Sequence, residues 1–239
     1  MPFQLRNTTY LNDSSGADSS FSSAHQQEGM FASGEDLVVP ITSESSQGAM
    51  LQVSNTLGTR LTVFVSFHDA NGGVLLSTMR VALGPKATFT YAMEKYLKGK
   101  KGFAVLHSGA SSSVIAGVMQ FARNKKKQVA YSYFVPAKPA FGTVLRGSYN
   151  TYMGQRSVVW IMNRSAVPQN VALSMVRSNG VSPSFPATFT VPARGMRLVT
   201  VPDVDNYGVV TVQTGTPNSL VSWVQRVRPD FVIPTPVRE

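Results

Sequence analysis

An internal repeat constrains the fold of this 239-residue chain more than any other feature of its sequence. Residues 50–72, MLQVSNTLGTRLTVFVSFHDANG, are matched about 108 positions later by residues 158–180, VVWIMNRSAVPQNVALSMVRSNG. The match keeps an Asn after the first apolar run, Asn55 and Asn163, and the same Asn-Gly pair at the end. A Pro turn, a Gly-led apolar run and a last run that ends in Arg follow in the same order. The sequence therefore predicts two copies of one module.

Each copy has the pattern of an antiparallel β-protein. Val63, Val65 and Phe67 alternate with their neighbours, and the run ends at the pair Asn71-Gly72. Alternation closed by Asn-Gly is a strong hairpin signal, because these residues tolerate the positive φ angles of tight turns. Further short runs follow between polar turns, with one helical turn expected at residues 92–98. The expected fold is all-β: two tandem antiparallel β-sandwich modules with an extended N-terminal arm.

The domain boundaries follow from changes in composition. Residues 1–36 form a Ser-rich, acidic arm, whose low-complexity part has too few apolar groups to fold alone. Module 1 spans residues 37–136, and module 2, its internal repeat, spans residues 143–239. Residues 137–142 are a linker stiffened by Pro, which favours a nearly fixed orientation of the modules.

Charge is distributed unevenly along the chain. The formal net charge is +10, yet residues 1–49 hold six acidic residues and one basic residue. An acidic arm on a basic body favours contact between them, within one copy or between neighbours, although both charges also serve solubility. Only 14% of residues are charged, which favours an extracellular or cell-surface assembly. No signal peptide is visible, so a cytoplasmic location stays open.

The sequence contains no constellation typical of an active site. Cysteine is absent, which excludes disulfides, zinc fingers and thiol catalysis. The three histidines lie far apart without metal-ligand spacing, and Asp203 and Asp205 lie in a turn-like stretch. No apolar run approaches the roughly 20 residues that a membrane helix needs. We therefore expect no catalytic residue, no metal site, no cofactor and no membrane-spanning segment, and we predict that the protein is not an enzyme.

The second module resembles a group of bacterial β-sandwich domains that includes the sensory-rhodopsin transducer proteins and modules of bacterial surface proteins. The resemblance is carried by Asn163, by the alternating run at residues 170–176, by Thr190-Val191-Pro192-Ala193-Arg194 and by the closing runs at residues 207–228. It implies a non-catalytic scaffold that oligomerises or binds ligands. The Ser-rich arm is not part of that pattern, and no feature demands a rhodopsin partner.

Two basic clusters with tyrosines nearby indicate a candidate polyanion site, because cationic loops next to aromatic rings are typical of such surfaces. Lysines at loop tips also keep a protein soluble and protect sheet edges, so these residues can be explained without a ligand. Nucleic acid is allowed by the pattern but is not the favoured partner. The candidate residues are Lys95, Lys98, Lys100, Lys101, Arg123, Lys125, Lys126 and Lys127, with Tyr96, Tyr131 and Tyr133 close by.

Large aromatic residues of module 2 give a candidate glycan site. Trp160, Trp223, Tyr149 and Tyr152 have the flat side chains on which sugar rings stack, and the tryptophans are specific to module 2. Trp160 replaces Leu51 or Gln52 of module 1, and Trp223 falls near Gly117. Core packing is the competing role for at least one of these rings.

The favoured hypothesis is a structural subunit that self-assembles into a filament, shell, sheath or appendage. Strand exchange is the expected mechanism, because an extended segment can pair with the open sheet edge of a neighbouring copy. A monomeric module that binds a carbohydrate or polyanion is the alternative, and a cytoplasmic signalling adaptor is a third. The candidate assembly residues are Asp36, Leu37, Val38, Val39 and Ile41 near the arm, and Phe231, Val232 and Ile233 near the C-terminus.

Overall fold

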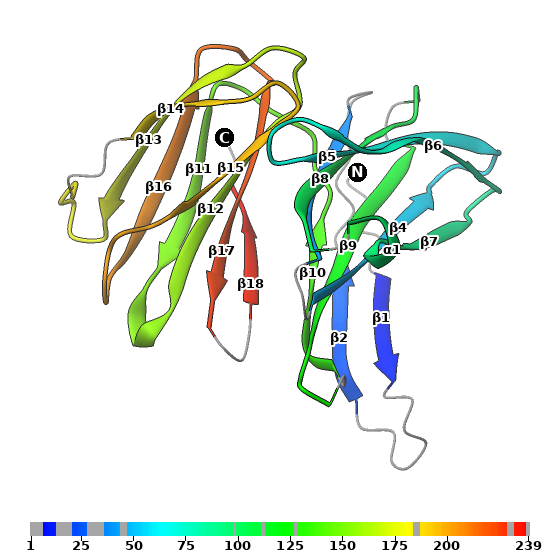
Figure 1. The fold of residues 1–239 in the computed structure, drawn as a ribbon, viewed down its shortest axis with the longest axis horizontal. Helices are drawn as coiled ribbons and strands as arrows, with labels where there is room; N and C mark the ends of the chain where they lie inside the picture. Colours follow the sequence, from blue (N-terminus) through cyan, green and yellow to red (C-terminus); the bar gives the residue numbers. More distant parts are fainter. Residues whose placement is uncertain are drawn as a thin grey trace. The chain divides into compact units, whose positions relative to one another are not determined.

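The structure is a computed structural model, and it describes residues 7–12, 21–27, 36–43, 47–97, 99–110, 113–126, 129–183, 187–228 and 232–237. The chain divides into two compact units, Met1–Phe67 with Val74–Lys138 and His68–Gly73 with Pro139–Glu239. Strands β3 to β10 build module 1, and strands β11 to β18 build module 2 (Figure 1).

Module 1 consists of two four-stranded antiparallel sheets, with strand orders β3-β8-β5-β6 and β10-β9-β4-β7. Apolar side chains alternate along its strands, which buries one face of each sheet in the sandwich core. One helical turn, α1 (Glu94–Leu97), falls in the stretch where the sequence predicted it. The strands are β3 (Leu37–Thr42), β4 (Gln47–Asn55), β5 (Leu61–Asp69), β6 (Val74–Leu83), β7 (Thr88–Ala92), β8 (Lys101–His107), β9 (Val114–Arg123) and β10 (Val129–Pro136).

Module 2 has two sheets with strand orders β11-β16-β13-β14 and β15-β12-β17-β18. A short 3-10 turn, η1 (Tyr152–Gly154), follows its first strand. The strands are β11 (Val144–Asn150), β12 (Arg156–Asn163), β13 (Gln169–Arg177), β14 (Ala187–Val191), β15 (Met196–Thr200), β16 (Tyr207–Thr214), β17 (Leu220–Val227) and β18 (Val232–Pro236).

The two modules have the same strand order. Replacing each strand of module 1 by the strand eight places later, β3 by β11 through β10 by β18, reproduces both sheets of module 2. The prediction of an all-β chain with two tandem β-sandwich modules is therefore confirmed.

A buried asparagine holds the same turn in each module. The Nδ2 group of Asn55 donates to the carbonyl oxygens of Thr59 at 2.7 Å and Gly84 at 2.8 Å, and its Oδ1 accepts from the Leu57 amide. In module 2, Asn163 donates to the carbonyl oxygens of Val167 and Pro192 and accepts from the Ser165 amide. One side chain thus satisfies three backbone groups and ties two turns together, which explains why the Asn is part of the repeat.

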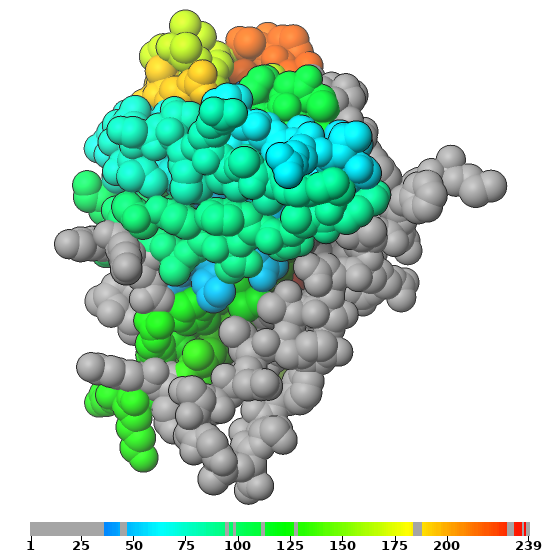
Figure 2. All heavy atoms as spheres, turned by 90° about the vertical axis from the view of Figure 1, so that its right-hand side faces the viewer, coloured from blue at the N-terminus to red at the C-terminus, as the bar shows by residue number. Residues whose placement is uncertain are grey.

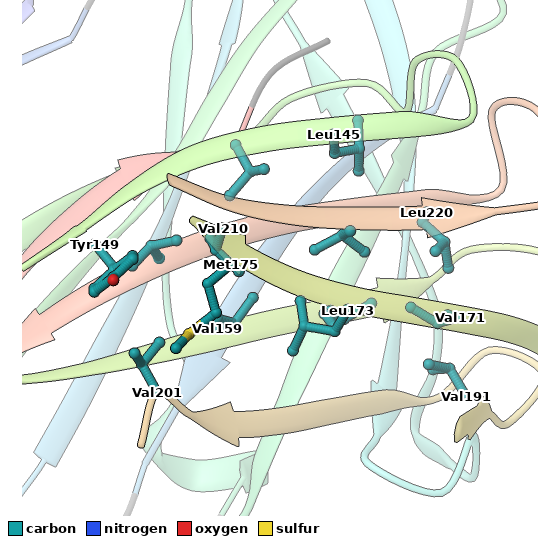
Figure 3. Packing of buried hydrophobic residues seen from close by; sticks show 14 residues of the cluster. Leu145, Tyr149, Val159, Val171, Leu173, Met175, Val191, Val201, Val210 and Leu220 are labelled. Carbon is teal, nitrogen blue, oxygen red and sulfur yellow. The ribbon is translucent and has the colours of Figure 1, made fainter. Parts of the chain in front are cut away.

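The core of module 2 lies between its sheets (Figure 3). Valine and leucine dominate it, as expected for strands whose branched side chains pack on a pleated surface. Its buried members are Leu145, Tyr149, Val159, Ile161, Val171, Leu173, Met175, Val191, Val201, Val210, Val212, Leu220, Val224 and Val237.

The arm contains two strands that the sequence did not predict, β1 (Asn7–Asn12) and β2 (Phe21–Gln27). They pair antiparallel, with Asn7 opposite Gln27 and a register shift near Asn12. Strand β2 lies beside β10 (Figure 1). Polar sequences can pair in this way because the hydrogen bonds between strands join backbone groups, whatever the side chains are. The expectation that the arm does not fold alone stays a prediction, since β2 is described in contact with module 1.

Candidate functional site

Strand pairing brings the two basic loops of module 1 to one end of its sandwich. Lys101, at the start of β8, pairs with Thr42 at the end of β3. Ala122, next to Arg123 at the end of β9, pairs with Gln47 at the start of β4. The Thr42 hydroxyl donates to Gln47 Oε1 at 3.0 Å, which joins the two sheets at this end. We call this the basic end of module 1.

The described cations of the basic end are solvent-accessible. Lys100, Lys125 and Lys126 are exposed, whereas Lys101 and Arg123 are half-buried. The Arg123 guanidinium lies 4.7 Å from the centre of the Phe121 ring, a cation–π geometry that fixes its direction. Lys98 and Lys127 lie outside the described residues, and of Lys95 only the backbone is described.

Tyr133, one of the tyrosines expected near the lysines, belongs to the interior of module 1. Its hydroxyl donates to Gln120 Oε1 at 2.8 Å, and the Gln120 side-chain amide donates to the carbonyl oxygen of Pro40 at 3.1 Å. The ring of Tyr131 lies 6.5 Å from that of Tyr133 and is half-buried. This network links β10, β9 and β3, so Tyr133 stabilises the sandwich and is not available to a ligand.

A row of three aromatic rings follows the edge strand β7 towards the basic end. Ring centroids of Phe89 and Tyr91 lie 5.8 Å apart, and those of Tyr91 and Tyr96 lie 5.3 Å apart. Phe89 and Tyr91 are half-buried, and 39% of Tyr96 is exposed. We call these residues the aromatic row. The sequence analysis placed Tyr96 with the lysines and missed the other two, although Thr88-Phe89-Thr90-Tyr91 alternates in a way that puts both rings on one face.

The four residues of the candidate glycan site are not gathered on one exposed surface. Tyr149 belongs to the core cluster. Trp160 and Trp223 pair across β12 and β17 and are 4% and 0% exposed. Tyr152, at 43% exposure, lies in η1 with its ring centroid 5.8 Å from that of Tyr207. Only Tyr152 presents its ring to solvent.

A buried carboxylate in module 2 is held by two partners. Arg177 contacts both oxygens of Asp203, the shortest distance being 2.7 Å from Nη2 to Oδ1, and the Tyr149 hydroxyl donates to Oδ2 at 2.7 Å. The hydrogen bond from Arg177, helped by that from Tyr149, lowers the pKa of Asp203 below its usual range despite burial. Burial and the bond to Asp203 raise the pKa of Tyr149. This Tyr–Asp–Arg cluster joins β11 and β13 to the loop after β15.

Both candidate assembly segments lie within the sheets of their own module. Residues 37–42 form β3, which pairs with β8 in continuous register, and Asp36 Oδ1 lies 2.8 Å from His107 Nδ1. Val38 also exchanges two backbone hydrogen bonds with Lys138 of the linker. Val232 and Ile233 belong to β18, which pairs with β17. Phe231 lies outside the described residues.

The described residues contain neither a membrane-spanning helix nor a metal-binding cluster. None of their helices is long and apolar enough to cross a membrane. No three His, Asp or Glu side chains among them are placed to hold a metal ion. Asp69 caps the β5–β6 turn, where its Oδ1 accepts from the amides of Asn71 and Gly73 at 2.8 Å each.

No protein-family model matches the chain, and no curated protein matches it. Among solved structures, an anti-sigma factor domain-containing protein is 9% identical with a TM-score of 0.23, covering 98% of this chain and 97% of that chain. A Bacteroides uniformis β-glucuronidase 2, covalently bound to cyclophellitol-6-carboxylate aziridine, is 11% identical with a TM-score of 0.23. That similarity covers 98% of this chain and 33% of the glucuronidase. With TM-scores this low, the similarities say nothing about function in this chain.

Proposed function

We propose that this protein is a non-enzymatic structural subunit that assembles with copies of itself by exchanging terminal strands. One observation carries the proposal. Strand β3 is the first strand of module 1 and lies at the edge of its sheet, and β18, the last described strand, lies at the edge of another. The two segments that the sequence marked for assembly thus contain the first strand of module 1, which follows the arm, and the last described strand of module 2, and both strands lie at a sheet edge.

A terminal edge strand is suited to exchange for a simple reason. It can leave its sheet without breaking the pairing of the remaining strands or threading the chain through a loop. Its departure uncovers the N–H and C=O groups of the next strand, which an identical strand from a neighbouring copy can satisfy. For β3, all six residue pairs with β8, from Leu37–Leu106 to Thr42–Lys101, would be remade between copies.

Charge supports the same assembly. The arm that precedes β3 is acidic, and the rest of the chain is basic. In the described structure β2 lies beside β10, the strand that follows the Lys125-Lys126 loop of the basic end. An arm that carries β3 to a neighbour would bring its negative charge to that copy's basic end, so assembly should be favoured at low salt.

The resemblance to sensory-rhodopsin transducer-like and bacterial surface modules belongs to this proposal. Such modules imply a non-catalytic scaffold that oligomerises, and the low charge density of the chain is compatible with a densely packed surface assembly. We therefore place the subunit in an extracellular or cell-surface array.

The absence of cysteine allows a direct test with disulfides. One preparation carries Thr42→Cys and a second carries Lys101→Cys, the residue pair that closes the β3–β8 register. The two are mixed, allowed to exchange and then oxidised. We expect a covalent heterodimer, because neither variant can form this bond within one chain.

The matched control uses the equivalent pair of module 2, Asn150→Cys mixed with Tyr207→Cys. Strand β11 corresponds to β3 but lies in the middle of the chain, so it should give no heterodimer. Light-scattering mass of the full chain beside a version that starts at Gly34 tests the arm. A heterodimer in neither mixture, together with two monomeric masses, would contradict strand exchange.

A second candidate function, polyanion binding, is favoured by the basic end itself. Both lysine loops converge there, and the charged side chains described at that end are all cations. Titration with dextran sulfate at a series of salt concentrations tests this candidate. Contacts between cations and a polyanion weaken steeply as salt rises, so binding that is absent or insensitive to salt would contradict it.

A further inference from the structure

The β5–β6 turn belongs to the second compact unit, where the β14–β15 loop covers it. The Met196 amide donates to the carbonyl oxygen of Ala70 at 2.9 Å. A Cβ placed on Gly72 would lie 2.0 Å from the carbonyl oxygen of Ala193, so the turn approaches the loop this closely only because it has a glycine there. Residues 192–196 thus hold the turn through backbone contacts.

Module 1 has the same loop between β6 and β7, at residues 84–88. A backbone hydrogen bond between the first and fourth residues closes each loop, and the third has a positive φ, 57° at Lys86 and 53° at Arg194. The fifth residue starts an edge strand in both modules. There, Met196 is 2% exposed, whereas Thr88 is exposed and no described residue accepts a hydrogen bond from its amide. Strands β6 and β7 lie on the side of module 1 that Figure 2 shows in cyan to green.

Module 2 has the same turn between β13 and β14. Gly72 and Gly180 close the two turns with φ angles of 91° and 81°. A Cβ placed on Gly180 would meet no atom within 4 Å beyond its chain neighbours. Ser178, in the place of Ala70, is exposed, and no described residue donates to its carbonyl oxygen. The repeat therefore presents both halves of the contact a second time, each of them uncovered.

Exposed apolar side chains surround the β13–β14 turn. Val176 and Val181 flank it at 41% and 49% exposure, whereas His68, in the place of Val176, is 6% exposed. Val209 pairs with Val176, and the carbonyl oxygen of Tyr207 accepts a backbone hydrogen bond from the turn. These two residues of β16 are 42% and 50% exposed. Exposed apolar residues grouped in this way mark a contact surface.

We propose that the β13–β14 turn of one copy docks on the β6–β7 loop of a second copy. The carbonyl oxygen of Ser178 would accept from the Thr88 amide, as that of Ala70 does from Met196 within the chain. A second copy is the occupant because the β14–β15 loop is already covered, and each chain supplies one uncovered turn and one uncovered loop. The inference deepens the proposed function and rests on it, since it names a further contact between assembled copies. The two surfaces differ, so the contact continues from copy to copy.

Two sequence differences set the strength of this contact. Ala87 stands where module 2 has Gly195, and a Cβ at Gly195 would lie 2.9 Å from the carbonyl oxygen of Ala70. The contact between copies must therefore be slightly wider and weaker than the one within the chain. Residues 176–181 contain no acidic residue to attract Lys86. Backbone and apolar groups would hold the contact, so it should persist as salt rises, whereas contacts of the acidic arm should weaken.

The test is the light-scattering mass of the full chain at a series of protein concentrations, in about 0.5 M salt to screen the acidic arm. Gly180→Asn keeps the turn, because Asn tolerates a positive φ, but adds a side chain where the docked turn has room for none. We expect it to raise the concentration needed for assembly at least about tenfold. The matched control is Gly99→Asn, at a glycine with a φ of 78° and equally open surroundings after α1, which should change nothing.

A second variant tests the loop. Ala87→Gly removes the methyl group that crowds the contact, so it should lower the concentration needed for assembly. The tryptophan fluorescence of Gly180→Asn in urea checks that module 2 stays folded. If its urea midpoint falls, Ala87→Gly decides, because assembly that it leaves unchanged contradicts the inference.

The remaining outcomes separate this inference from the proposed function. If wild type and Gly180→Asn form large particles at the same concentration, the turn is not a contact, and assembly by strand exchange stands. If the full chain stays monomeric at every concentration, both at low salt and at high salt, the inference and the proposed function are both wrong.

Discussion

Modules 1 and 2 share every strand and the buried Asn that ties their turns, yet they fill equivalent positions with different chemistry. The cross-strand pair Gln52–Gly117 of module 1 becomes the pair Trp160–Trp223 in module 2. At the third strand of this ladder, Gly117 faces Pro136 and Trp223 faces Pro236. The register is thus the same on both sides, and only the side chains differ.

The reason for Gly117 lies in its neighbours. A Cβ placed there would lie 2.1 Å from Cζ of Phe134 and 2.8 Å from the carbonyl oxygen of Val135. Module 1 therefore covers this face of its sheet with a ring from the adjacent strand, whereas module 2 places a ring at the position itself. The two modules thus have the same strand pairing, but the aromatic ring that covers this face of the sheet comes from a different strand in each module.

Polar networks differ in the same way. Module 1 links three strands through the neutral chain Tyr133–Gln120–Pro40, and module 2 uses the ionic cluster of Tyr149, Asp203 and Arg177. A neutral network does not titrate near pH 4, but a buried carboxylate does. The two modules should therefore respond differently to acid.

The largest expected effect tests what the modules share. Asn163→Ala leaves two carbonyl groups and one amide without their buried partner and should lower the stability of module 2 by about 3 kcal/mol. Both tryptophans lie in module 2, so their fluorescence in a urea titration reports that module alone, while circular dichroism reports both. Asn55→Ala should move the dichroism transition of module 1 by a similar amount.

Asn170→Ala is the control for this pair, since Asn170 is exposed and bonds only the Thr190 hydroxyl at the surface. It should cost less than about 0.5 kcal/mol. If Asn55→Ala shifts the tryptophan transition as far as Asn163→Ala does, the modules unfold as one unit and the comparison breaks.

An intermediate effect tests where the modules differ. Gly117→Ala forces Phe134 out of its place and should destabilise module 1 by about 2 kcal/mol, as overpacking typically does. The tryptophan transition should stay where it is. The double variant Gly117→Ala with Phe134→Ala removes the clash with the ring and leaves only the contact with the Val135 carbonyl oxygen, so Gly117→Ala should cost less in the Phe134→Ala background than it does alone. If the losses of unfolding free energy of the two single variants simply add in the double variant, the explanation for Gly117 is wrong.

The smallest effect concerns acid. Asp203 has a lower pKa folded than unfolded, so its contribution to stability is complete above its ordinary value of 3.8 and is lost as pH falls through the folded value. Arg177→Gln should lower the urea midpoint of the tryptophan transition at neutral pH, and the difference from wild type should shrink below pH 3.8. Arg197→Gln, on an exposed residue of β15, is the matched control. A constant difference across this pH range would show that Asp203 is not the group responsible.

Much of the architecture could be read from particular residues. The Asn-Gly pairs lie in the β5–β6 and β13–β14 turns, where Gly72 and Gly180 have φ angles of 91° and 81°. The strands fall where apolar residues alternate, because that period leaves one face of a sheet in the core. The candidate sites were harder to predict from the sequence. The sequence places Tyr96 among lysines, but the stacking of Phe89, Tyr91 and Tyr96 depends on how α1 folds back after β7.

By itself the sequence determined the fold class, the repeat and the presence of two lysine-rich loops in module 1, since periodicity, turn residues and composition are local properties of the chain. Only the tertiary structure decided which aromatic residues are buried. Tyr149, Trp160 and Trp223 look the same in sequence as Tyr91 and Tyr96, and burial depends on which strands lie across from them. The tertiary structure also placed β3 and β18 at the edges of their sheets. Strand order is set by contacts between distant residues, which no local pattern encodes.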